Sequence, residues 1–63
     1  MNVRKLGVPI YENELGQQYV TRADLKLALD RDVYERLIEN TAEFVMDDGV
    51  LRGYSIDWLE NQR

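Results

Sequence analysis

Residues 21–49 read TRADLKLALDRDVYERLIENTAEFVMDDG, and no other long run of the chain has helical periodicity with helix signals at both ends. Thr21 and Asp24 have the spacing of a capping box, in which the threonine hydroxyl accepts an orphan backbone amide. Gly49 stands where a left-handed C-terminal cap is expected. The stretch therefore predicts a helical centre against which the shorter flanking segments pack.

Two apolar stripes within this stretch predict two helices. At about 100° per residue, Leu25, Ala28 and Leu29 lie on one side of a helical wheel. A second cluster is centred about 150° away and consists of Val33, Phe44, Leu37, Thr41, Tyr34, Val45 and Ile38. A straight helix cannot bury both stripes against one core, and leaving a leucine in water costs roughly 1.5–3 kcal/mol. Opposite charges four residues apart favour a continuous helix by only ~0.2–0.5 kcal/mol for each pair.

We therefore expect helices over residues 22–30 and 32–47, although a single continuous helix remains the alternative. Asp32 and Glu35 supply the start signal of the second helix.

The N-terminal segment has the alternation of a strand. Leu6, Val8 and Ile10 alternate with polar or turn-forming residues, which predicts a half-buried strand. Pro9 cannot donate a ladder hydrogen bond, so we expect this strand at the edge of a sheet.

A turn over residues 12–16 and a short strand over residues 17–20 would complete an N-terminal β-hairpin. The alternative is an N-terminal arm, in which Arg4 and Lys5 are free to meet a partner.

The C-terminal segment predicts one strand and one helix. Residues 50–54 are partly β-branched and aromatic and would add a third strand, although Gly53 weakens this interpretation. Ser55 is placed as the N-cap of a terminal helix over residues 56–62. Trp58 in that helix is interpreted first as a packing residue and alternatively as part of a binding surface.

Composition points to one small α+β domain over residues 1–63, in a cytoplasmic setting. The chain has 63 residues, no cysteine and a formal charge of −4. The absence of cysteine excludes disulfides, a thiolate nucleophile and cysteine-based zinc sites. The acidic balance opposes attraction to nucleic acid and to anionic membranes, and no apolar run reaches the length of a membrane span.

The residue types that enzymes use most often are missing. The chain lacks histidine as well as cysteine, and Ser55, its only serine, is better explained as a cap. Carboxylates close in sequence are Asp30 with Asp32, Asp47 with Asp48, and Glu12 with Glu14, without the spacing of a calcium loop. We therefore expect no catalysis, no cofactor and no metal.

The outward side of the predicted second helix is the most informative surface. On the wheel it gathers an acidic arc opposite the apolar stripe, which would meet a basic surface on another protein. An ordinary solvated face is the alternative. The expected partner-binding residues are Asp32, Glu35, Glu39, Glu43 and Asp47 with the aromatics Tyr54 and Trp58.

Three short segments give a resemblance to a known family. Residues 19–25 are similar to the start of the first helix in the excisionase and MerR-type winged helix-turn-helix family, and residues 33–40 resemble its DNA-reading helix. Residues 52–60 look like the wing returning into a terminal helix. The resemblance covers residues 19–60, with a shorter turn and a more acidic second helix than the family has. It implies a winged-helix fold and DNA contacts from Arg22, Lys26, Arg31, Arg36 and Arg52.

Three functions follow from these observations. The first is a non-enzymatic protein-binding module, in the style of a small bacterial or phage regulator, which would inhibit a nucleic-acid-binding partner through its acidic surface. The second is a DNA-binding regulator of the excisionase type. The third is a structural subunit that adds its Pro9-bearing edge strand to a partner or to itself, and we also expect weak self-association at high concentration.

Overall fold

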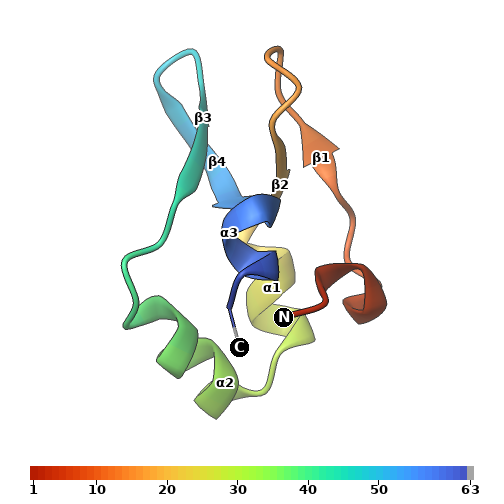
Figure 1. The fold of residues 1–63 in the computed structure, drawn as a ribbon, viewed down its shortest axis with the longest axis vertical. Coiled ribbons are helices and arrows are strands. Elements are labelled where there is room, and N and C mark those ends of the chain that lie inside the picture. Colours follow the sequence, from red (N-terminus) through yellow and green to blue (C-terminus); the bar gives the residue numbers. More distant parts are fainter. Residues whose placement is uncertain (63) are drawn as a thin grey trace.

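The computed structural model describes residues 1–62, which form a four-stranded antiparallel sheet with three α-helices (Figure 1). This confirms the predicted α+β class for a single small domain. No helix in residues 1–62 is long and apolar enough to cross a membrane. In chain order the elements are the 3-10 helix η1 (Val3–Leu6), β1 (Tyr11–Glu12), β2 (Gln18–Val20), α1 (Arg22–Ala28), α2 (Arg31–Ile38), β3 (Phe44–Asp47), β4 (Val50–Ser55) and α3 (Ile56–Glu60).

The sheet is built from two hairpins that meet at their second strands. Its order is β1-β2-β4-β3, so β2 and β4 are central and β1 and β3 lie at the edges. Both hairpin turns point to one end of the molecule, while the three helices occupy the other end (Figure 1).

The core lies where the helices and η1 pack against the central strands. Val20 on β2 and Tyr54 on β4 are partners in the sheet and are 0% and 2% exposed. Every helix contributes to the same cluster. Its buried members are Val3, Val20, Leu25, Leu37, Tyr54, Ile56, Trp58 and Leu59.

The predicted break between two central helices is confirmed. The Thr21 hydroxyl accepts a hydrogen bond from the Asp24 amide at 3.2 Å, as the capping signal indicates. Helix α1 ends at Ala28 because Leu29 and Asp30 are extended, and α2 begins at Arg31. The break lets Leu25 and Leu37 reach one core from differently directed helices.

The second helix is half as long as the sequence pattern predicts. Instead of spanning residues 32–47 it ends at Ile38, and residues 44–47 form β3. Asp48 and Gly49 have φ values of 52° and 75°, the left-handed pair that a two-residue hairpin turn requires. Gly49 is therefore part of a hairpin turn and not a helix cap.

The predicted N-terminal strand over residues 6–10 is wrong. Residues 3–6 form η1, and Leu6 packs against the core from the end of η1, whereas Val8 and Ile10 do so from irregular chain. The hairpin of this region is shorter, with Tyr11 opposite Tyr19. Pro9 lies on no strand, which removes the edge strand on which the structural-subunit hypothesis depends.

The C-terminal prediction of a third strand and a capped helix is confirmed. Residues 50–55 form β4 beside β2, and the Ser55 hydroxyl accepts from the Trp58 amide at 3.5 Å. Gly53 is required because a Cβ there would lie 2.8 Å from the carbonyl carbon of Val20 and closer still to its oxygen. Because Gly53 has no side chain, the backbone of β4 can pass close to Val20 and Thr21, where β2 ends and α1 begins.

Proline at position 31 should be accepted. Arg31 is the first residue of α2, and Asp30 before it has φ −59° and ψ 149°, the conformation that a residue before proline prefers. We expect Arg31→Pro to change the free energy of unfolding by less than about 1 kcal/mol, since its exposed ion pair contributes little. Proline at position 32 fits less well, because it would push Arg31 out of the helical region. Glu35→Pro, inside α2, should cost about 3 kcal/mol in urea unfolding; equal stability of the two variants would contradict the observed start of α2.

Alanine at position 53 should destabilise the protein strongly. The new Cβ meets backbone atoms of Val20 that cannot move without displacing β2, so we expect a loss of about 3 kcal/mol. Gly49→Ala is the control, since nothing lies within 4 Å of the place that its new Cβ would take and only the positive φ opposes it, at roughly 1–2 kcal/mol. Thermal melts should rank wild type above Gly49→Ala and that variant above Gly53→Ala; the reverse order would disprove the close approach.

Candidate interaction surface

The predicted acidic arc is divided among three elements. Asp32 and Glu35 lie on α2, and Glu39 directly follows it, all three exposed. Glu43 is in the connection to β3 and Asp47 is on β3, because the helix ends earlier than expected. The arc is thus a short acidic face on α2, which we define as Asp32, Glu35 and Glu39, and a separate group of carboxylates on the β3–β4 hairpin.

The acidic face is held outward by the burial of the opposite side of α2. Leu37 is 5% exposed and anchors the helix in the core, while Asp32, Glu35 and Glu39 project on the other side. The nearest cation is Arg31, whose Nε lies 3.0 Å from Glu35 Oε1 in an exposed pair. Glu39 follows the last turn, where a negative charge opposes the helix dipole. This position does not serve stability, which leaves the side chain available for another role.

Tyr54 and Trp58 are buried, whereas the predicted binding surface requires them to be exposed. They are 2% and 8% exposed, and their rings stack with centroids 5.9 Å apart. Phe44 continues the row, with its ring 5.1 Å from that of Tyr54. The packing interpretation of Trp58 is the correct one, because the capped start of α3 turns its ring inward.

The Tyr54 hydroxyl is kept neutral by its surroundings. Burial raises its pKa, the Tyr34 hydroxyl 3.5 Å away raises it further, and the Arg22 guanidinium lowers it in part. A raised pKa means that folding favours the protonated form. This contribution to stability is present below the usual tyrosine pKa of 10.0 and is lost as the pH rises through the higher folded value.

The basic side chains named by the family resemblance are mostly engaged with acceptors of this chain. Arg31 is paired with Glu35, and Arg52 Nε lies 4.0 Å from Asp47 Oδ2. Arg36 Nε donates to a backbone carbonyl of its own helix at 3.4 Å. These residues are spread over α1, α2 and β4, and two of them, Lys26 and Arg31, line the same hollow between α1 and α2. The complete set is Arg22, Lys26, Arg31, Arg36 and Arg52.

A surface that the sequence analysis does not predict lies on the β3–β4 hairpin. Phe44, Met46 and Leu51 are 41%, 47% and 41% exposed. Phe44 is opposite Tyr54 and Met46 is opposite Leu51, and the register shifts between these two pairs, which leaves Arg52 of β4 without a partner in β3. Phe44 and Met46 are two residues apart on β3, the spacing of side chains that share one face of a strand. We call these three residues the hairpin face. The signal that could have revealed it is Asp48-Gly49 between apolar residues, which is a strong short-range hairpin pattern.

The two hairpins are joined by Asn13, the one buried polar residue within residues 1–62. Its side-chain amide donates to the Met46 carbonyl at 3.0 Å and to Gln17 Oε1 at 2.7 Å. Its side-chain oxygen accepts from the amides of Leu15 and Gln17, at 3.0 and 2.9 Å. One side chain thus fixes the turn of the first hairpin and attaches it to β3.

This attachment gathers carboxylates beside the hairpin face. Carboxylate oxygens of Glu14, Asp47 and Asp48 lie within 4.8 Å of one another. Glu14 and Asp48 are exposed, so water screens their repulsion. The hairpin end of the molecule is therefore apolar with an acidic border.

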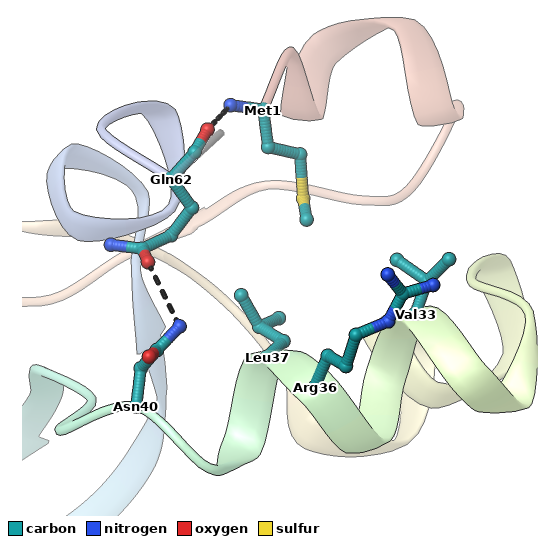
Figure 2. A pocket seen from close by; sticks show the side chains of 6 residues that line it. All are labelled: Met1, Val33, Arg36, Leu37, Asn40 and Gln62. Atoms are coloured by element: carbon teal, nitrogen blue, oxygen red, sulfur yellow. Dashed lines mark hydrogen bonds between the residues drawn. The ribbon is translucent and has the colours of Figure 1, made fainter.

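A hollow lies between α2 and the two ends of the described chain (Figure 2). Its volume is about 250 Å³, and Asn40 Nδ2 donates to Gln62 Oε1 at 3.3 Å across it. The Met1 amine donates to the Gln62 carbonyl. Arg36 is the one charged side chain of the lining. The lining residues are Met1, Val33, Arg36, Leu37, Asn40 and Gln62.

Comparisons of the chain with models of protein families, with curated proteins and with solved structures find no match. The resemblance of residues 19–60 to the winged helix-turn-helix family therefore stays a prediction.

Removing the Asn13 side chain should loosen the hairpin end. Asn13→Ala leaves the Met46 carbonyl and two turn amides without their partner, and each lost hydrogen bond costs about 1 kcal/mol. We expect a loss of about 2–3 kcal/mol in thermal unfolding and faster amide exchange in residues 13–17. Gln17→Ala, which removes one of these bonds, should cost about 1 kcal/mol; equal effects would show that Asn13 does not join the hairpins.

Proposed function

We propose that this protein is a non-enzymatic binding module that attaches to a basic surface of another protein through the acidic face of α2. The observation that carries the proposal is the charge distribution on α2. Its outward side presents Asp32, Glu35 and Glu39 together with Arg36, and within residues 1–62 Arg31 is the one cation that forms a salt bridge with these carboxylates.

The acidic face suits recognition by charge. Complementary charges raise the rate of encounter and exclude like-charged partners, more than they raise the final affinity. The formal charge of −4 adds a long-range attraction to any basic partner. Leu37 anchors α2 in the core, so the backbone that carries the acidic side chains is already ordered before a partner binds.

A partner that itself binds nucleic acid fits this proposal well. The phosphate-binding surface of such a partner is rich in lysine and arginine, and an acidic helix would occupy it in place of phosphates. The protein would then act as an inhibitor, and duplex DNA should compete with it for the partner.

Direct DNA binding is the second candidate, and the order of the elements favours it. Two helices separated by a two-residue break precede a β-hairpin and a short helix, which is the order that the family resemblance implies. In that arrangement α2 would enter the major groove. Its outward side would then bring Asp32, Glu35 and Glu39 toward phosphates, which is the reason we place this candidate second.

Neutralising the acidic face should separate the two candidates. We expect Asp32→Asn, Glu35→Gln and Glu39→Gln together to slow association with a captured basic partner about tenfold at low salt, and less at high salt. Immobilised wild-type protein first serves as bait, and a partner that it retains but the variant does not is chosen. Surface plasmon resonance then measures the association rate of that partner with each protein.

The matched control carries the same charge change elsewhere. Glu12→Gln, Asp57→Asn and Glu60→Gln neutralise three exposed carboxylates away from α2. If the control slows association as much as the α2 variant, net charge alone is responsible and the acidic face is not the site. Retention of wild-type protein on duplex DNA, strengthened by the α2 variant, would support the winged-helix candidate instead.

A further inference from the structure

The hairpin face continues the core beyond the part that helices cover. Phe44, Tyr54 and Trp58 form one row of aromatic contacts, with centroid distances of 5.1 and 5.9 Å. Tyr54 and Trp58 are buried, whereas Phe44, Met46 and Leu51 emerge to between 41% and 47% exposure. Figure 1 shows the β3–β4 hairpin extending past the helices. The β3–β4 hairpin thus keeps three large apolar side chains exposed beyond the buried part of the aromatic row.

The border of the hairpin face is mainly acidic, and Arg52, its cation, is paired with Asp47. Glu43 precedes Phe44 and is exposed, and the carboxylates of Glu14, Asp47 and Asp48 gather at the turn. An apolar centre with a polar border is the usual anatomy of a protein interface. The sign of that border indicates which occupant fits.

A second copy of this chain is a poor occupant. An isologous contact would place the carboxylates of each copy against those of the other, and like charges brought together across an interface are destabilising. A segment of another protein with apolar residues flanked by lysine or arginine matches both the centre and the border.

We propose that the hairpin face, formed by Phe44, Met46 and Leu51, docks a basic amphipathic segment of a partner protein. This site is separate from the acidic face of α2. The inference rests on the proposed function only in assuming that the partner is basic. Apolar contact supplies affinity at Met46 and Leu51, while the exposed carboxylates of Glu14 and Asp48 select for positive charge; Asp47 beside them is paired with Arg52. The Asn13 bond to the Met46 carbonyl holds both parts in place.

The test uses a labelled synthetic peptide in which leucine and lysine alternate. Two comparison peptides replace every leucine with serine, or every lysine with glutamate. Fluorescence anisotropy should show the leucine–lysine peptide binding wild-type protein at least about tenfold more tightly than either comparison peptide, and more weakly as salt rises.

Variants locate the binding. Met46→Thr with Leu51→Thr keeps strand propensity and should remove the preference for leucine. Leu27→Thr with Ile38→Thr is the control, because those helical residues are exposed to 86% and 46% and lie outside the hairpin face. Glu14→Gln with Asp48→Asn should weaken lysine selection, and asparagine suits the positive φ at position 48.

Each other outcome overturns the inference. Equal binding of the serine–lysine peptide, or unchanged binding by the Met46 and Leu51 variant, would show that the apolar centre is not used. Sedimentation that shows self-association rising with salt and abolished by the same variant would assign the face to a second copy. The α2 variant separates the two proposals: if it alone loses the peptide, the hairpin inference fails and the proposed function stands.

Discussion

The backbone of β4 passes that of β2 at Gly53 so closely that no side chain fits between them. Because of this approach, β2 can turn into α1 at Thr21 while β4 turns into α3 one residue after Tyr54. Two capped helices therefore begin beside each other at the centre of the sheet, and their buried residues share one core. A chain of this size buries little surface, so a core assembled at a single crossing is an efficient solution.

The signals that predict the structure correctly are local. Thr21 and Ser55 are helix caps, because each hydroxyl accepts a hydrogen bond from the backbone amide three residues later. Such a bond depends on no residue far away in the chain. The break before Arg31 follows from the two apolar stripes, which no straight helix can bury. These features depend on the nearest neighbours in the chain, where sequence reasoning is strongest.

The wrong predictions fall where pairing across the chain decides the structure. Phe44, Val45 and Met46 fit a helical wheel and also alternate as a strand, and only pairing with β4 determines which holds. The exposed carboxylates of α2 are predictable from the sequence, whereas the hairpin face is not, because it requires a strand at residues 44–47. The junction at Asn13 leaves no sequence signal either, since its contact with Met46 spans 33 residues.

The aromatic row also gives the protein an intrinsic optical signal. Trp58 is the only tryptophan of the chain and stacks on Tyr54, so its emission reports on a single, defined environment. Phe44 connects that environment to the solvent-exposed part of the hairpin. Binding at the hairpin can therefore be followed through the tryptophan fluorescence of the unlabelled protein, because Tyr54 lies between the indole and the exposed ring of Phe44.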